Sequence, residues 1–321
     1  MASVTPDAKV SVVSPARVRR IGSRLATLVS AVLLGGIGCV VSPGLATKGT
    51  VDVPGGSFVM GSTLDERAAA LERSYAGRGR VFEGASLWIK QEHAQKVVEV
   101  PRFRMMERPV TQIEYLAFVR TRGAPEPYVD AITWSRAGTG IEYQDVQHFL
   151  WKKGEPEAER WRHPVVLVSQ IEARSYCAWW GRGRGGVGEL PDEAQWEKAA
   201  RGEKGRDYPW GDHFDPGLLN SAESGPWDTV AVGLYDGGES PYGFKDMAGN
   251  VFEWTASVED DGLAIVKGGS WNTYGGFARA AARHARPLGL RHISIGFRCV
   301  LTLAKEKPTA SSGSSRNSSS V

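Results

Sequence analysis

One stretch of the sequence decides the fold: Tyr242-Gly243-Phe244-Lys245-Asp246-Met247-Ala248-Gly249-Asn250-Val251-Phe252-Glu253-Trp254. Two shorter motifs follow it, Lys267-Gly268-Gly269-Ser270-Trp271 and Gly296-Phe297-Arg298-Cys299. Glycines stand beside large aromatic side chains in all three, which is typical of turns and loops that buried aromatic residues hold in place. The whole chain shares this composition, with 39 Gly and 11 Trp in 321 residues. We therefore expect short strands and much irregular structure.

Three segments before this stretch carry helix signals at both ends. Each begins with a capping box, in which two side chains three residues apart bind each other's backbone N–H groups. Each also has a glycine where the helix should stop. The capping pairs and stops are Thr111–Glu114 with Gly123, Ser169–Glu172 with Gly181, and Asp192–Gln195 with Gly202.

Short apolar runs bounded by Gly, Pro, Asn and Asp predict strands at Gly56–Met60, Val165–Val168 and Val230–Leu234. Together with the helices, these runs favour a compact α+β fold. No linker divides residues 51–303, so we expect one domain there. The composition, with 41% hydrophobic and 23% charged residues, excludes a wholly disordered, collagen-like or polytopic membrane protein.

The formal net charge of +3 comes from the two ends of the chain. Residues 1–24 and 304–321 are both basic, and the body between them is slightly acidic. Binding to nucleic acid relies on a basic face that neutralises phosphates. We therefore expect no nucleic-acid partner.

The N-terminal residues resemble an export signal of the bacterial lipoprotein type. A basic start precedes the apolar run Leu25–Leu34 and then Gly36-Ile37-Gly38-Cys39, which is similar to a lipobox. We expect residues 1–38 to be the signal peptide, Cys39 to carry lipid and residues 39–50 to be a linker. The mature protein would then be an exported lipoprotein of the cell envelope, attached to the membrane through its lipid anchor.

Two alternatives remain for this region. Residues Leu25–Thr47 carry no charge and could span a bilayer, although several glycines and Pro43 interrupt the second half. Cleavage after Ala46 would instead release a protein without lipid. At the other end, residues 304–321 are rich in serine and are expected to form a disordered tail.

Common catalytic signatures are absent from the sequence. No two of the six histidines have the spacing of paired metal ligands on a helix, and there is no Gly-x-Ser-x-Gly or phosphate-binding Gly-Lys-Ser/Thr sequence. Gly183, Gly185 and Gly188 spell a dinucleotide-binding pattern, but they follow a predicted helix rather than a strand. This position favours a surface loop.

The order of the motifs is the most specific feature of the chain. Before those quoted above come Pro54-Gly55-Gly56-Ser57-Phe58-Val59-Met60-Gly61, Arg108-Pro109-Val110-Thr111, Leu190-Pro191-Asp192-Glu193-Ala194-Gln195-Trp196-Glu197 and Tyr208-Pro209-Trp210-Gly211-Asp212. This succession, over about residues 51–301, resembles the sulfatase-modifying-factor family, whose best-known member is formylglycine-generating enzyme. The resemblance implies the variant of the C-type lectin fold that this family has. It also implies a disulfide between Cys177 and Cys299, with two buried free thiols as the alternative.

The resemblance further implies a structural calcium ion. Asp246, Gly249, Val251 and Glu253 match the positions that bind calcium in the family. Two carboxylates and two main-chain carbonyls on a glycine-containing turn are hard oxygen ligands, which suit calcium. The alternative is that Asp246 caps a turn and Glu253 forms an ion pair.

The family's oxidase chemistry depends on two cysteines shortly after Gly-Gly-Ser, which hold copper(I) and engage a substrate thiol. Thr273 and Ala278 occupy those positions here, and no Cys lies between Cys177 and Cys299. We therefore expect no catalytic cysteines and no copper.

The residues around these positions suit a polar cleft instead. Asn272, Thr273, Tyr274 and Arg279 offer hydrogen-bonding groups that could hold a peptide, protein or glycan ligand. The sequence thus favours a binding or scaffolding module over an enzyme. The alternatives are an oxidoreductase that converts a protein cysteine to formylglycine, an iron-dependent relative, and a cleft that is an inert remnant.

Overall fold

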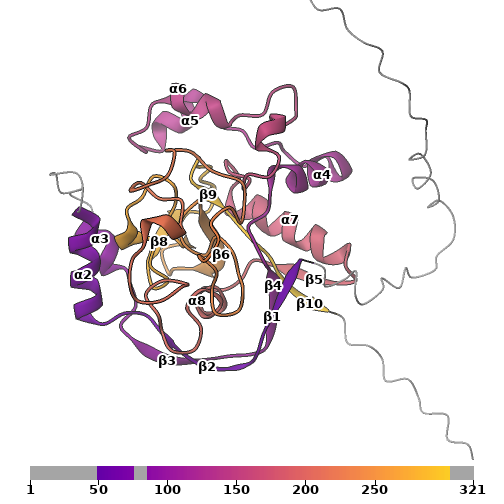
Figure 1. Cartoon of the computed structure of the whole chain (residues 1–321). Helices are drawn as coiled ribbons and strands as arrows, with labels where there is room; N and C mark the ends of the chain where they lie inside the picture. The colour runs from indigo at the N-terminus through magenta and orange to yellow at the C-terminus, as the bar shows by residue number, and fades with distance from the viewer. Residues whose placement is uncertain (1–48, 76–84, 304–321) are drawn as a thin grey trace, which may run out of the picture. The chain divides into compact units, whose positions relative to one another are not determined.

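The computed structural model of the chain describes residues 49–75 and 85–303, which belong to one compact unit (Figure 1). The predicted signal peptide, Cys39 and the predicted tail at residues 304–321 lie outside these ranges. None of the helices within them combines the length and the hydropathy that a membrane span requires.

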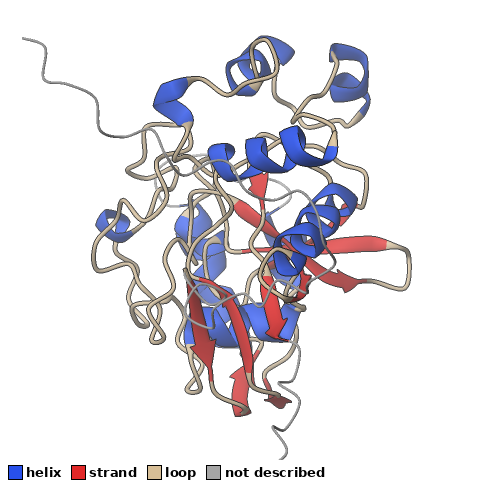
Figure 2. Cartoon of the chain, turned by 90° about the vertical axis from the view of Figure 1, so that its right-hand side faces the viewer, coloured by secondary structure: helices blue, strands red, loops and turns tan. Residues whose placement is uncertain are grey.

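Short helices and strands alternate with long loops (Figure 2). The helices are α2 (Leu64–Tyr75), α3 (Ala85–Lys90), α4 (Gln112–Arg122), α5 (Ala131–Arg136), α6 (Tyr143–Val146), α7 (Gln170–Arg182) and α8 (Glu193–Arg201). The strands are β1 (Thr50–Val53), β2 (Gly56–Met60), β3 (Lys96–Val100), β4 (Phe103–Met106), β5 (Gly186–Glu189), β6 (Phe252–Val258), β7 (Leu263–Lys267), β8 (Arg283–Pro287), β9 (Ile295–Gly296) and β10 (Val300–Leu303). The predicted α+β fold is confirmed.

The strands form sheets in the orders β1-β4-β10-β5, β2-β3 and β8-β7-β6-β9. In the first sheet, Val300 of β10 lies opposite Met105 on one side and Glu189 on the other, so the last strand pairs with two strands from earlier in the chain. In the third sheet, β7 pairs antiparallel with β6 and β8, whereas β9 pairs parallel with β6. Figure 1 shows this sheet in the centre of the view, with α2 and α3 on the left and α5 and α6 above.

The predicted capping boxes are confirmed. Thr111, Ser169 and Asp192 are the N-caps of α4, α7 and α8, and each forms its capping box. Helices α4 and α8 stop at the predicted glycines. The predicted stop of α7 at Gly181 is wrong, because the helix continues to Arg182 and is capped by Gly183.

Close packing, rather than helix termination, explains the glycine at 181. A Cβ atom on Gly181 would lie 2.0 Å from the backbone nitrogen of Gly188, and one on Gly188 would lie 2.1 Å from the carbonyl oxygen of Cys177. These two glycines allow β5 to approach the backbone of α7 directly. Gly188 pairs with Leu301 inside a sheet, so the dinucleotide-like spacing of glycines has a packing explanation.

One of the predicted strands is confirmed and two are wrong. Gly56–Met60 is β2, but Val165–Val168 and Val230–Leu234 form no strand. Leu167 has a φ of +59°, which interrupts the extended backbone of the first run. In the second run, the N–H of Val230 donates to the side chain of Asn250 at 3.0 Å rather than to a neighbouring strand.

Buried tryptophans pin the loops to the core. Trp196 and Trp254 are fully buried, and the indole N–H of Trp254 donates to the carbonyl oxygen of Val168 at 2.9 Å. Trp271 stacks on Phe149 with ring centroids 5.9 Å apart. A buried indole contributes a large apolar surface together with one directed hydrogen bond, which fixes loops that have no strand partners.

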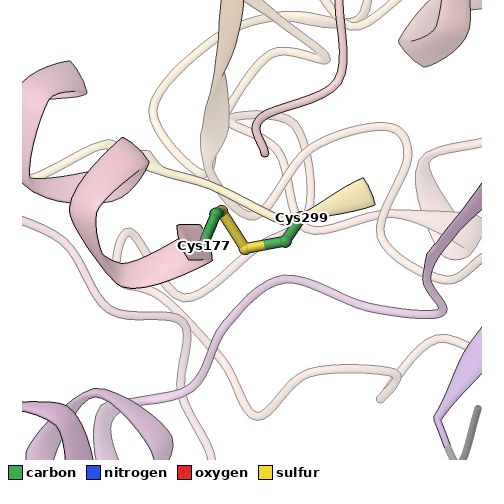
Figure 3. Close-up of a disulfide and its surroundings, with 2 residues drawn as sticks. All are labelled: Cys177 and Cys299. Atoms are coloured by element: carbon green, nitrogen blue, oxygen red, sulfur yellow. A yellow bond between two sulfur atoms is a disulfide. The ribbon is translucent and has the colours of Figure 1, made fainter. Parts of the chain in front are cut away.

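A disulfide joins Cys177 of α7 to Cys299 just before β10, as the family resemblance implied (Figure 3). The two Cα atoms are 5.5 Å apart and the residues are separated by 122 positions. Both cysteines are fully buried. The bond therefore ties the middle of the chain to its last strand.

Candidate functional site

A cavity of 1170 Å³ lies where α3, α5, the start of α7, β8 and the loop after β8 meet. Its aromatic side chains are Trp88, Tyr128, Trp134, Phe252 and His292, and its charged side chains are Asp130, Arg136, Glu172, Arg286 and Arg291. Asn272 and Thr273 lie in the same lining, as the sequence predicted for a polar cleft. The volume is somewhat above the range of about 300–1,000 Å³ that is typical of small-molecule sites, so a peptide-sized ligand has room.

The turn after β7 brings Asn272 and Thr273 to this cavity. Gly268 and Gly269 have φ values of +96° and +73°, which only glycine adopts without strain. The hydroxyl of Thr273 accepts from the N–H of Ser270 at 2.8 Å and donates to the Ser270 carbonyl at 3.0 Å. Both hydrogen bonds close the turn, so the hydroxyl is already engaged.

Two of the predicted cleft residues, Tyr274 and Arg279, do not line the cavity, and neither does Ala278, which stands at one of the cysteine positions. Ala278 is fully buried, and a Cβ atom on Gly269 would lie 2.8 Å from its Cα atom. The prediction that Arg279 faces the cleft is wrong, because its guanidinium is buried, pairs with Glu92 and lies 3.6 Å from Asp207. Tyr274 is half-buried and does not belong to the lining of the cavity.

A buried charge network fixes the strand that leads into this turn. The Nζ atom of Lys267, the last residue of β7, lies 2.9 Å from Glu197 and 3.6 Å from Glu193 of α8. Arg283 of β8 donates to the same Glu193 at 2.7 Å. Although burial opposes ionisation, Lys267 and Arg283 hold the pKa of Glu193 far below its usual range. The network anchors β7 and β8 to α8, and sequence reasoning missed it.

The two acidic side chains in the cavity lining already have hydrogen-bond or ion-pair partners within the protein. Glu172 accepts from the backbone N–H of Ser169 at 2.9 Å and pairs with Arg291. Asp130 is the N-cap of α5 and accepts from the N–H groups of Ile132 and Thr133 at 3.0 and 2.9 Å. Hydrogen bonds from Thr133 lower the pKa of Asp130, so this carboxylate stays ionised.

The two carboxylates predicted to bind calcium, Glu253 and Asp246, have different environments in the structure. Glu253 is fully buried and accepts from the indole of Trp196 at 2.9 Å and from two nitrogens of Arg298 at 2.6 and 2.7 Å. This arrangement is the ion pair that the sequence left open as the alternative. A guanidinium that pairs with both carboxylate oxygens supplies the positive charge that calcium would supply, so Glu253 does not fit a calcium-ligand role.

Asp246 fits the role of a cation ligand better than Glu253 does. Its Oδ2 atom accepts from the N–H of Gly233 at 2.6 Å, and burial together with nearby Glu253 raises its pKa to about 6. A cation beside this carboxylate would favour its ionised form. Over residues 49–75 and 85–303, no group of three or more His, Cys, Asp and Glu side chains is arranged to hold a metal ion. Calcium at Asp246, Gly249 and Val251 stays a prediction.

Several cavity residues were not identified from the sequence. These residues are Trp88, Trp134, Arg286 and His292. They come from three segments that lie far apart in the chain and carry no shared motif, with Arg286 and His292 in the same segment. The position of Trp88 in an apolar run beside Leu87 and Ile89 indicates only a buried helix face.

Known proteins match this chain over most of its length. Residues 41–303 match the family described as the sulfatase-modifying factor enzyme 1-like domain. The inactive C-alpha-formylglycine-generating enzyme 2 of Bos taurus is 30% identical, over 79% of this chain and 88% of its own. The formylglycine-generating enzyme of Streptomyces coelicolor is 28% identical, over 79% and 90%. A hercynine oxygenase of Mycolicibacterium thermoresistibile is 33% identical, over 53% of this chain and 39% of its own.

Solved structures show the same fold. PvdO from Pseudomonas aeruginosa aligns with a TM-score of 0.58 and 21% identity, over 79% of this chain and 94% of its own. CarF aligns with a TM-score of 0.52 and 20% identity, over 79% and 98%. The predicted fold, the formylglycine-generating-enzyme type of C-type lectin fold, is thereby confirmed. The family match, the relatives and the fold agree, and the chain belongs to the sulfatase-modifying-factor family of formylglycine-generating-enzyme-like domains.

Proposed function

We propose that this protein is an exported, lipid-anchored member of the family that binds a ligand in its cavity and carries out no copper oxidation. The observation that carries the proposal is the pair of residues at the cysteine positions. Thr273 reaches the cavity, but its hydroxyl closes a turn, and Ala278 is a fully buried methyl group. Copper(I) requires soft ligands such as thiolates, and neither side chain is one.

The remaining cysteines do not compensate for this loss. Cys177 and Cys299 are joined to each other, and Cys39 precedes the domain. The name of the Bos taurus relative describes that protein as inactive, and it is among the relatives that cover most of this chain. The large cavity, which Thr273 lines, supports ligand binding as the function of this domain.

Copper retention tests the proposal directly. We expect the purified protein, loaded with copper(I) and passed over a competing copper(I) chelator, to retain no stoichiometric copper, because hard oxygen groups bind this ion weakly. The metal content is measured by mass spectrometry, with the Streptomyces coelicolor relative treated in parallel. Retention of one copper per chain after the chelator step would contradict the proposal.

The lipid anchor makes a separate prediction. Replacement Cys39→Ala removes the thiol that would carry the lipid, so the protein should move from the membrane fraction to the soluble fraction of the cell envelope. Fractionation followed by immunoblotting measures the shift, and Ser42→Ala serves as the control from the same segment. Unchanged membrane partition of Cys39→Ala would favour a membrane-spanning helix at Leu25–Thr47 instead.

A further inference from the structure

We infer that the ligand of the cavity carries an anionic oxygen group, a carboxylate, phosphate or sulfate, and that Arg286 binds this group. The inference rests on the proposal that the cavity binds a ligand, and it adds the chemical class of that ligand. Three observations carry it: an arginine without an acidic partner, acceptors that the protein has already filled, and further hydrogen-bond donors that remain open.

Arg286 is a partly buried cation of the cavity lining for which the described residues provide no counter-charge. Its guanidinium lies 5.0 Å from the ring centroid of Trp88, in the same cavity lining. One nitrogen, Nη1, donates to the carbonyl oxygen of Ala285 at 2.9 Å. Among the described residues, Arg286 forms no ion pair, and its Nε and Nη2 groups have no hydrogen-bond acceptor. An arginine presents these two groups in the fixed geometry that matches a carboxylate or phosphate.

The acidic residues of the lining cannot neutralise Arg286. Glu172 accepts from Ser169 and pairs with Arg291, and Asp130 caps α5 through two backbone N–H groups. Each of these carboxylates is therefore already engaged within the protein. A ligand would meet filled acceptors, the partly buried Arg286, and the exposed Arg136, which also forms no ion pair among the described residues.

Two other side chains add open donors to the same lining. The Oδ1 atom of Asn272 accepts from the hydroxyl of Ser270 at 2.8 Å, which leaves the amide nitrogen to donate elsewhere. The Nδ1 atom of His292 accepts from the N–H of Ser294 at 3.2 Å, so the proton of a neutral ring lies on Nε2. This tautomer is assigned from the hydrogen bond. Both donors favour a ligand that accepts hydrogen bonds.

The electrostatics agree with an anionic ligand. Burial lowers the pKa of Arg286, and no carboxylate offsets that effect. Burial and the charge of Arg286 lower the pKa of His292 to about 4, so His292 is neutral at pH 7 and adds no positive charge to that of Arg286. An anion bound at Arg286 would remove the cost of keeping this cation unpaired in a partly buried site.

Calorimetry with small anions tests the inference without knowledge of the natural ligand. The probes are sodium sulfate, inorganic phosphate, N-acetylglycine and its uncharged amide, at constant ionic strength in chloride. We expect at least one of the three anions to bind the wild-type protein saturably, and the amide to bind about tenfold more weakly than N-acetylglycine if the carboxylate is the preferred group. The relative affinities of the three anions identify the source of the anionic group.

Matched variants assign the binding to Arg286. Arg286→Gln should weaken the binding of the preferred anion about tenfold or more, because a charge-assisted hydrogen bond is lost. Arg122→Gln is the control, since Arg122 is exposed and lies outside the cavity lining. It should change the affinity less than about twofold. Circular dichroism confirms that both variants are folded.

The possible outcomes separate this inference from the proposed function. Absence of saturable binding by all three anions, or equal affinities of wild type and Arg286→Gln, would overturn the inference. Where N-acetylglycine is the preferred anion, equal binding of N-acetylglycine and its amide would also overturn the inference, while the proposed binding function of the cavity would stand. Copper-dependent oxidation of a peptide would instead overturn the proposed function and leave the anion measurement unaffected. Should Arg286→Gln fail to fold, Arg286→Lys takes its place, because lysine keeps the charge but not the paired N–H groups and should also weaken binding of the preferred anion.

Discussion

The double substitution Cys177→Ala/Cys299→Ala should lower the free energy of unfolding by about 4–5 kcal/mol. The disulfide closes a loop of 122 residues, and a loop of this length greatly restricts the unfolded chain. The two free energies are obtained from urea denaturation of the oxidised wild type and the variant. Wild type treated with reductant should unfold at the urea concentration at which the variant unfolds.

Two results would contradict this account of the disulfide. Equal unfolding midpoints for wild type and the double variant would show that the bond contributes nothing to stability. Two alkylatable thiols in the folded, unreduced domain, detected by peptide mass spectrometry, would show that the bond does not form.

The second large effect is expected at the buried pair of Glu253 and Arg298. Glu253→Gln should cost about 3–5 kcal/mol of unfolding free energy, because it leaves a fully buried guanidinium without its counter-charge. Chemical denaturation measures this loss. The matched control is Glu155→Gln, which breaks an exposed pair with Arg120 and should cost less than about 1 kcal/mol. Equal losses in the two variants would contradict the role assigned to the buried pair.

The same stretch allows a test for calcium. If calcium binds at Asp246, the native state gains about 2.7 kcal/mol at a hundred-fold excess of calcium over the dissociation constant. A calcium chelator should then lower the melting temperature of wild type but not of Asp246→Asn. A wild-type melting temperature that does not respond to the chelator would leave Asp246 with only its turn-capping contact to Gly233.

The parts of the fold that follow from local chemistry were predictable from the sequence. The capping boxes at Thr111, Ser169 and Asp192 mark their helices because the signal lies within one turn of chain. Gly181 misled the prediction because its role depends on Gly188, a residue of another element. A glycine required for close packing and a glycine that ends a helix look alike in a sequence.

The candidate site was predictable only in part, for a related reason. Asn272 and Thr273 were identified through the motif that precedes them, and they do line the cavity. Arg279 lies close to them in sequence, but the turn directs its side chain to Glu92 in the core. Arg286 could not be identified from the sequence, because its proposed role rests on the absence of an acidic partner. That absence is visible only in the folded chain, where β8 lies beside α3. Charge balance across a cavity is a property of the folded chain.

The most direct test of the central claim is a search for product. The purified protein is incubated with copper(I), oxygen and a peptide that contains the sulfatase-type Cys-x-Pro-x-Arg sequence, and the peptide is then analysed by mass spectrometry. The Streptomyces coelicolor formylglycine-generating enzyme serves as the positive control. Because Thr273 and Ala278 provide no thiolate to hold copper and the substrate sulfur, we predict that the peptide mass stays unchanged. Copper-dependent conversion of the cysteine to the aldehyde, retained after further purification of the protein, would contradict the account.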